Sequence, residues 1–297
     1  KFKIVSYSDP IYNFKSIKNK AEIKNMKSVH IKDGVALTKF LYWIKQEKNF
    51  GFDELFLIKK LEKFRKKNKD YIYPSFNTIA GSGPNAAIIH YRSSKKTNRK
   101  IKKKDIFLCD SGGQYKYGTT DVTRTVCFKK PLDKIRNIFT RVLKGHIAVA
   151  MNDLSTINKG YLIDRKARAA LNKVNLDYSH GTGHGVGFFS NVHEGPQSIS
   201  KFNSVEIKEG MIVSNEPGYY EEGKFGIRIE NLIYAEKVKN KLKFKNLTMA
   251  PIDKDLINLK FLNKKEKNYL LNYHLLVYSK ISKYLSQQER KWLVRNI

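Results

Sequence analysis

The sequence predicts an α+β fold, because hairpin-like strand segments alternate with amphipathic helices. Residues 105–128 indicate a β-hairpin, in which an apolar segment and a β-branched segment flank a stretch with three glycines. Residues 21–47 carry apolar side chains near helical spacing over several turns, which predicts a long amphipathic helix. With 297 residues, 41% of them hydrophobic, the chain can bury a substantial core as one large domain or two small ones.

Two aspartates, Asp110 and Asp121, lie eleven positions apart within this hairpin. A buried strand seldom carries an unpaired carboxylate, because removing a charge from water is costly without a partner. A pair of carboxylates at neighbouring strand ends indicates either a shared cation or two ordinary turn aspartates. The hairpin alone does not separate these alternatives.

The other elements are predicted in chain order. We expect residues 1–20 to form the end of a strand and a linker, as the remnant of a preceding domain. The expected helices are at 21–47, at 52–64 with Asp53 as the cap, at about 132–151, at about 161–174, and one or two after Asn263. The expected strands run from Ala86 to Tyr91, from Met211 to Glu216 with a Pro-Gly turn after it, and over 225–234. Residues 92–104 are expected as a basic surface loop and 237–246 as a lysine-rich connection.

Residues 180–196 contain three of the seven histidines, His180, His184 and His193, embedded in glycine. Their spacing fits neither a G-x-G-x-x-G nucleotide loop nor a helical H-E-x-x-H zinc site. Glycine at this density allows a close backbone approach to a ligand. The lone histidines on predicted helices, His30 and His146, are interpreted as structural.

Further charged residues lie on strands that are predicted to be buried, as the two aspartates do. Glu216 ends one predicted strand, and Arg228 and Glu230 share a face of the next. Four carboxylates and one imidazole form a hard ligand set that suits Mn²⁺ and tolerates Co²⁺ or Zn²⁺. Four negative charges are balanced by two divalent cations, and paired metals can hold a bridging water and lower its pKa. The sequence alone does not decide whether His90 is a core residue or a site residue.

The formal net charge of +31 comes almost entirely from lysine, with 47 Lys against 11 Arg spread along the chain. Specific nucleic-acid readers favour arginine for bidentate contacts, so we expect no specific nucleic-acid partner, although weak adhesion to polyanions remains compatible with this charge.

No apolar run approaches the roughly 18 residues of a membrane span, so no membrane association is expected. The N-terminal residues lack the apolar core of a signal peptide and an initiator Met, which favours a fragment or processed product. Cys109 and Cys127 are expected to be buried, reduced thiols that could lie close together.

Five segments together resemble aminopeptidase P (Xaa-Pro aminopeptidase), a pita-bread metallopeptidase related to methionine aminopeptidase and prolidase. They are residues 110–125, 180–187, 192–196, 215–220 and 226–231. The resemblance runs from about residue 21 to the end, and residues 248–253 with the last helices are similar to the long, cytosolic type. It implies a curved, mostly antiparallel sheet covered by helices, in a catalytic domain over 21–297 whose C-terminal helical extension covers about 248–297.

The resemblance also implies roles for individual residues. His193 would contact the substrate and shuttle protons, His90 and His180 would line the pocket, and Arg228 would brace the bridging carboxylates. Asp121 and Glu230 would bridge the two metals. The implied dimetal ligands are Asp110, Asp121, His184, Glu216 and Glu230.

The implied activity is metal-dependent hydrolysis by a bridging hydroxide, which releases the first residue of peptides with proline second. Such an enzyme would be a cytoplasmic homodimer with two divalent ions, most readily Mn²⁺. Two alternatives stay open: a prolidase-type Xaa-Pro dipeptidase, and a non-catalytic pita-bread module that binds protein or RNA. The chain departs from the family at Tyr117, where many relatives have an acidic residue, and in lacking the preceding domains.

Overall fold

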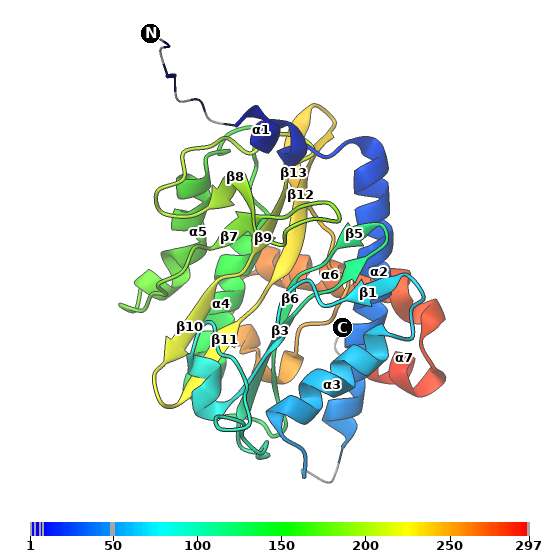
Figure 1. Ribbon diagram of the computed structural model, residues 1–297. Coiled ribbons are helices and arrows are strands. Elements are labelled where there is room, and N and C mark those ends of the chain that lie inside the picture. The colour runs from blue at the N-terminus through cyan, green and yellow to red at the C-terminus, as the bar shows by residue number, and fades with distance from the viewer. Residues whose placement is uncertain (1, 3, 6, 8, 48–50, 296–297) are drawn as a thin grey trace.

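The computed structural model describes residues 2, 4, 5, 7, 9–47 and 51–295, and it confirms an α+β fold (Figure 1). The helices are α1 Pro10–Ser16, α2 Lys20–Gln46, α3 Glu54–Arg65, α4 Asp133–Ala150, α5 Gly160–Asn172, α6 Lys264–Ile281 and α7 Gln287–Val294, with short 3₁₀ segments η1 Gly83–Ala87, η2 Lys254–Leu256, η3 Leu259–Phe261 and η4 Ser282–Tyr284. The strands are β1 Tyr71–Tyr73, β2 Ile79–Ser82, β3 Ile106–Ser111, β4 Gln114–Tyr115, β5 Gly118–Thr119, β6 Val122–Cys127, β7 Gly183–Gly185, β8 Glu194–Ile199, β9 Ile212–Asn215, β10 Gly218–Glu221, β11 Phe225–Arg228, β12 Asn231–Val238 and β13 Lys241–Asn246.

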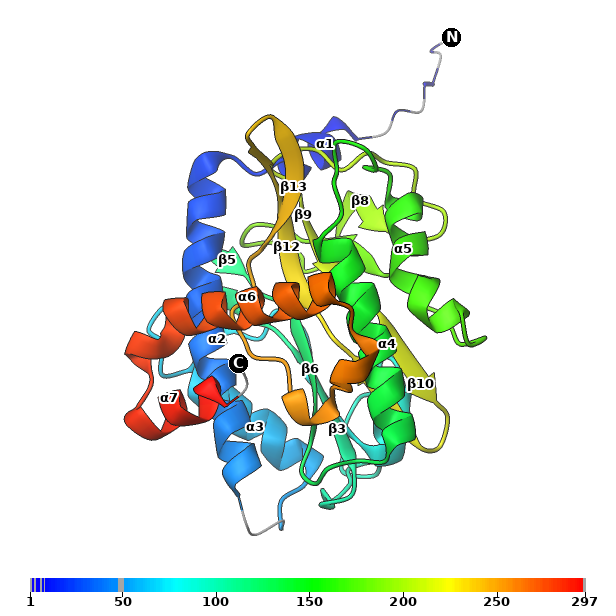
Figure 2. The same ribbon diagram turned by 180° about the vertical axis from the view of Figure 1, so that it is seen from behind.

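The described strands pair antiparallel throughout, in four small sheets. The largest has the order β13-β12-β9-β7-β8, and a second has the order β2-β3-β6. The two-stranded sheet β10-β11 and the three-stranded sheet β1-β4-β5 complete the set. Helices α4, α5 and α6 cover one side of the strands (Figure 2), which leaves the opposite side, seen in Figure 1, for a site. None of the described helices combines the length and apolar character needed to cross a membrane.

Helix α2 forms as the sequence predicts. Asn19 accepts hydrogen bonds from the first-turn amides and Glu22 reaches back to the Asn19 amide, so the helix begins with a capping box. Its predicted apolar stripe packs inward, with Met26, Val29 and Phe40 fully buried. Helix α3 is capped by Asp53, whose carboxylate accepts from the Phe56 amide, again as predicted.

The predicted hairpin is present, since β3 and β6 pair with Asp110 opposite Thr123. Its connection is longer than a tight turn, because β4 and β5 form a second small hairpin that pairs with β1. Gly118 has a φ of +153°, and a Cβ there would lie 2.6 Å from the Met26 sulfur. Glycine at this position therefore lets β5 pack directly against α2.

The two cysteines of this hairpin are buried free thiols, as predicted, but they are not opposite each other. Cys109 faces Arg124 across the ladder and Cys127 faces Ile106. The register of the two strands therefore offsets the cysteines along the ladder.

Two local predictions are wrong because turn residues were given too little weight. Residues 86–91 were expected as a strand, but Pro84 lies in the first turn of the 3₁₀ segment η1, and the chain then turns at His90. Residues 237–246 were expected as a connection, but Lys239 and Asn240 turn at positive φ and β13 pairs back onto β12. The alternation of lysine with Leu242 and Phe244 is the strand signal that the charge concealed.

Two further boundaries differ from expectation. Among the described residues of 1–20, the segment Pro10–Ser16 is helix α1, and the strand-like contact is a single bridge of Ile17 with Met211. The single strand expected at 225–234 is divided into β11 and β12, with Ile229 and Glu230 between them. This break turns Glu230 towards the β3–β6 hairpin, where its amide donates to the Thr123 carbonyl at 3.2 Å.

A buried ion pair connects α2, α3 and the hairpin. The Arg65 guanidinium donates to both oxygens of Asp33, at 2.7 and 3.2 Å, and both side chains are almost fully buried. Tyr115 donates to the same aspartate at 2.8 Å. Arg65 also donates to the Ser111 hydroxyl at 3.1 Å, which ties α3 to the residue that follows Asp110.

We expect Arg65→Met to lower the free energy of unfolding by about 3–5 kcal/mol, because it leaves the Asp33 carboxylate buried without a counter-charge. Lys66→Met is the matched control, since Lys66 pairs with Glu62 at an exposed position, and its effect should stay within about 0.5 kcal/mol. Urea unfolding followed by circular dichroism measures both. Equal effects of the two substitutions would show that Asp33 does not depend on Arg65.

Candidate metal centre

A cavity of about 250 Å³ brings together every residue that the sequence analysis assigned to the site. Its polar lining comes from the β3–β6 hairpin, from the loops around β7, and from the ends of β9 and β11. The predicted residues that line it are His90, Asp110, Asp121, His180, His184, His193, Glu216, Arg228 and Glu230.

Asp110 and Asp121 enter this cavity from the two strands of the hairpin. Asp110 lies in β3, where one carboxylate oxygen accepts from Arg228 Nη2 at 2.6 Å. The other oxygen, Asp110 Oδ1, and Asp121 Oδ1 are buried and receive no hydrogen bond from any described residue. A buried carboxylate oxygen without a donor requires an explanation, and a bound cation provides one.

His184 presents one ring nitrogen to these carboxylates. Its Nδ1 donates to the Gly185 carbonyl at 2.8 Å, which leaves the Nε2 lone pair directed at the cavity. Nε2 lies 3.4 Å from Asp121 Oδ2 and 3.4 Å from Glu216 Oε1. Asp121, His184 and Glu230 each offer a ligand atom within 4.8 Å of the others, a spacing compatible with a shared metal ion.

Hydroxyl groups orient the two glutamates. Thr123 Oγ1 donates to Glu230 Oε2 at 2.7 Å, and Ser214 Oγ donates to Glu216 Oε1 at 3.0 Å. Each of these donors leaves the other oxygen of its glutamate free for another partner. Both hydroxyls lie on strands next to the glutamates, so the orientation is built into the sheets.

The carboxylates repel one another strongly in the absence of cations. Burial raises the pKa of Asp121 well above its usual range, and the charge of Asp110 raises it further. Burial followed by the charge of Asp121 does the same for Glu230, and burial raises the pKa of Glu216. Arg228 supplies one positive charge to four carboxylates, so the donor set fits two divalent cations.

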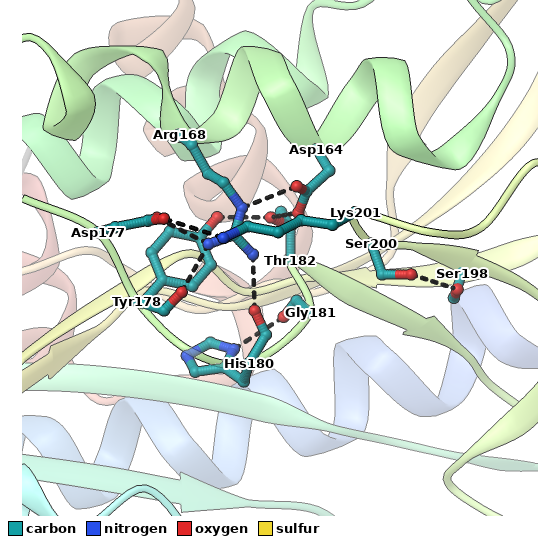
Figure 3. Close-up of polar contacts among 10 residues, drawn as sticks. All are labelled: Asp164, Arg168, Asp177, Tyr178, His180, Gly181, Thr182, Ser198, Ser200 and Lys201. Atoms are coloured by element: carbon teal, nitrogen blue, oxygen red, sulfur yellow. Dashed lines mark hydrogen bonds and ion pairs between the residues drawn. The ribbon is translucent and has the colours of Figure 1, made fainter.

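The His180 loop wraps around a buried arginine of helix α5 (Figure 3). Arg168 donates to the carbonyls of Tyr178 and His180 at 2.6 and 2.7 Å, and its guanidinium lies 3.9 Å from the centre of the Tyr178 ring. Two aspartates, Asp164 and Asp177, accept from the same guanidinium, each at 2.7 Å. The Arg168 side chain therefore holds the backbone of this loop at two points, Tyr178 and His180.

The His180 side chain is held by a residue that the sequence analysis missed. Its Nδ1 donates to the Gly181 carbonyl, and its Nε2 accepts from the Tyr220 hydroxyl at 2.9 Å. Tyr220 in turn accepts from Arg228 Nη1 at 2.6 Å. Burial, reinforced by Arg228, lowers the pKa of His180 to about 3, so the ring is neutral at physiological pH.

His193 and His90 complete the histidine set. The His193 ring packs against His184 with centroids 4.1 Å apart, and burial followed by His184 lowers its pKa to about 4. His90 is exposed and lines the cavity, which resolves the open alternative against a core role. The helical histidines are structural, as predicted: the rings of His30 and His146 are buried against the carbonyls of Met26 and Asn215.

The glycines of this segment mainly allow strands, rather than a ligand, to approach. A Cβ at Gly183 would lie 2.0 Å from the Ser214 carbonyl oxygen, and one at Gly185 would lie 2.3 Å from the Glu194 carbonyl oxygen. Both contacts are with neighbouring strand segments. Only Gly181 and Gly183 border the cavity itself.

One wall of the cavity is apolar, and the sequence analysis did not identify it. Its side chains come from the segment around β2 and η1 and from the loop before β8. They are Phe76, Ile79, Ile89 and Val192. Apolar residues in such positions are indistinguishable by sequence from core residues, so no signal in one sequence could have marked them.

Comparisons with known proteins agree with this geometry. A model of metallopeptidase family M24 matches residues 24–237, and a model of the C-terminal region of peptidase M24 matches residues 240–297. A probable Xaa-Pro aminopeptidase P of Laccaria bicolor is 46% identical over 96% of this chain and 47% of its own length.

Solved structures give the same result. An X-prolyl aminopeptidase of Caenorhabditis elegans, described as a cytosolic enzyme with a di-nuclear active site, matches with a TM-score of 0.92 and 36% identity over 97% of this chain and 49% of that one. A prolidase of Thermococcus sibiricus matches with a TM-score of 0.69 and 33% identity over 82% of this chain and 62% of that one. The chain spans about half the length of the two aminopeptidases.

We expect Mn²⁺ to raise the melting temperature of the metal-stripped protein, and to raise it more at pH 8 than at pH 5. The pKa values of Asp121 and Glu230 are raised in the folded protein, so folding takes up protons and the cluster destabilises the fold increasingly as pH rises. Cations relieve this repulsion. Differential scanning fluorimetry across this pH range measures the shift.

Glu230→Gln should remove most of this Mn²⁺-dependent shift, whereas Glu222→Gln, at an exposed glutamate outside the cavity, should keep it. An equal shift in both variants would contradict a cation site at the carboxylates.

We expect Arg168→Lys to loosen the His180 loop, because one ammonium cannot reach the four acceptors that the guanidinium holds. Hydrogen exchange of the amides at 177–182 should become faster. Arg165→Lys, on the exposed side of the same helix, is the control and should leave these amides unchanged. Unaltered protection in the Arg168 variant would show that the loop is held by other contacts.

Proposed function

The chain belongs to metallopeptidase family M24, and on this premise we propose that it is the catalytic part of an Xaa-Pro aminopeptidase. Its reaction would release the first residue of peptides that have proline in second position. The observation that carries the proposal is the cavity in which four carboxylates, four histidines and one arginine converge beside an apolar wall. A binding module has no need for this complete set.

Two divalent cations, with Mn²⁺ favoured, would be held by Asp110, Asp121, His184, Glu216 and Glu230. By the family resemblance, Asp121 and Glu230 would bridge the ions. Both are buried, and each offers an oxygen within 4.8 Å of the other and of a His184 nitrogen. The unsatisfied oxygens of Asp110 and Asp121 support this assignment. Bound as a pair, the cations would lower the pKa of a bridging water and so supply a hydroxide nucleophile at neutral pH.

The surrounding residues would hold the peptide and move its protons. His193 stands beside His184 at the cavity, where a neutral imidazole can hydrogen-bond the scissile amide, take up the proton that the attacking water releases and pass a proton to the departing amine. Neutral His180 would contact the peptide carbonyl side, with its ring fixed by Tyr220. Arg228 keeps Asp110 oriented and links it to the same tyrosine.

The apolar wall supports a preference for proline. Phe76, Ile79, Ile89 and Val192 offer apolar surface for the pyrrolidine ring beside the charged groups, since Ile79 pairs with Asp110 across the β2–β3 ladder. An Xaa-Pro amide has no N–H, so a proline-specific wall needs no acceptor at that point. His90 borders this wall and would contact the residue after the scissile bond.

The organisation of the whole protein is proposed from the same resemblance. We propose one catalytic domain over 21–297, including the helical extension at about 248–297, and a homodimer in the cytoplasm. The description of the Caenorhabditis elegans relative as cytosolic supports the location. Sedimentation of the full protein tests the dimer.

The proposed activity predicts Mn²⁺-dependent release of arginine from an Arg-Pro-Pro tripeptide, measured by mass spectrometry. Arg-Ala-Pro is the control substrate and should be cleaved poorly. Hydrolysis of Xaa-Pro dipeptides in preference to the tripeptide would favour a prolidase instead. Absence of metal-dependent release by the full-length protein would contradict the aminopeptidase proposal.

Two substitutions separate metal binding from proton transfer. Glu216→Gln should reduce the metal content from two ions per chain to one, as measured by plasma emission spectroscopy. His193→Gln should keep both ions and lower kcat by about 10²-fold or more, because a proton-transfer group is lost. Full activity of either variant would remove that residue from its proposed role.

A further inference from the structure

The ring of His193 has no hydrogen-bond partner among the residues that the structure describes. It lies on the loop that joins β7 to β8 and packs on His184. The placement of this ring therefore depends on how the loop backbone is held. The next residue, Glu194, is the first of β8.

Glu194 points into the protein and is held by a lysine from the start of the chain. The Lys18 ammonium donates to Glu194 Oε1, and the two side chains are 1% and 2% exposed. Lys15 lies 3.8 Å from the other oxygen but is 36% exposed, so it contributes a much weaker, screened interaction. An ion pair this deeply buried fixes its partners in place, because separation would leave either charge unsolvated.

Lys18 is itself anchored at both ends. Its ammonium also donates to the Ser16 carbonyl at 3.3 Å, and its backbone amide donates to the Gly210 carbonyl at 3.0 Å. The preceding residue, Ile17, forms a bridge with Met211 at the start of the β9 segment. The ammonium thus has a fixed position relative to the central sheet.

The Glu194 carboxylate fills the space under the His193 loop. A Cβ at Gly187 would lie 3.2 Å from Glu194 Oε2, and the Gly187 amide closes the loop by donating to the Asn191 carbonyl at 3.0 Å. The loop therefore packs on this carboxylate at the His193 end, while Gln114 holds it at its tip by donating to the Ser190 carbonyl at 2.7 Å.

We propose that Lys18 is a positioning residue for His193, acting through the buried Glu194 carboxylate. This rests on the proposed function, in which His193 serves the reaction. Lys18 lies before residue 24, where the family match begins, and within the stretch that we expected to be a linker. The functional unit then includes residues 16–18 as well as the catalytic domain.

The test compares Lys18→Met with Lys15→Met in the full chain loaded with Mn²⁺. Misplacing a reacting group by about 1 Å can cost up to 10²-fold in rate, so Lys18→Met should lower kcat by about tenfold or more. Its metal content should stay at the wild-type value and KM should change less than kcat. Lys15→Met should match the wild type, and a Lys18→Met kcat equal to it would overturn the proposal.

A double variant separates positioning from stability. Lys18→Met with Glu194→Gln removes the unpaired buried charge, so it should recover much of any lost melting temperature while kcat stays low. It also serves as the test if the single variant does not fold. Recovery of wild-type kcat in the double variant would show that the pair only stabilises the fold.

A measurement that does not depend on enzymatic activity tests the inference separately from the proposed function. In the metal-free protein, the imidazole C–H signals of His193 can be identified by their absence in His193→Gln. Lys18→Met should shift or broaden them, and Lys15→Met should not. If no peptide is hydrolysed, the proposed function fails while these signals still decide whether Lys18 places His193; unchanged signals would refute it.

Discussion

Mutual repulsion among four clustered carboxylates is the constraint on which the rest of this structure depends. Asp110, Asp121 and Glu230 are buried and Glu216 is partly buried, and Arg228 is the arginine that lines the same cavity. Such a cluster persists only where the surrounding backbone is rigid enough to prevent its members from turning outwards. The sheets supply that rigidity, and the hydroxyls of Thr123 in β6 and Ser214 in β9 each fix one glutamate by one oxygen.

The site was more predictable from the sequence than the elements around it. A carboxylate on an apolar strand is conspicuous, so the ligand candidates could be identified one at a time, and the resemblance supplied their grouping. No such signal marks Tyr220, Arg168 or the apolar wall. A tyrosine after a turn and an isoleucine in a strand are common in any fold, so neither stands out from its neighbours in the sequence. Strand β13 was missed for the opposite reason, since its lysines concealed an alternating pattern.

A few of the many lysines in this chain have specific structural roles. Most are exposed, as a solvated surface requires, but Lys18 is buried on Glu194 and Lys45 is largely buried between Asp253 and the Cys127 carbonyl. Cys127, Asp253 and Asp255 lie close enough to suggest a second metal site. The Lys45 ammonium already bonds both aspartates there, so this cluster is neutralised from within the chain.

The scattering of the carboxylates along the chain determines when during folding a cation can bind. Asp110 and Asp121 meet within one hairpin, but His184, Glu216 and Glu230 arrive from a different sheet, more than 60 residues later. No short segment contains a complete site, so we expect metal capture to follow the docking of these segments instead of nucleating it. Cations that bind at this stage would slow the unfolding of the finished protein and leave its rate of folding unchanged.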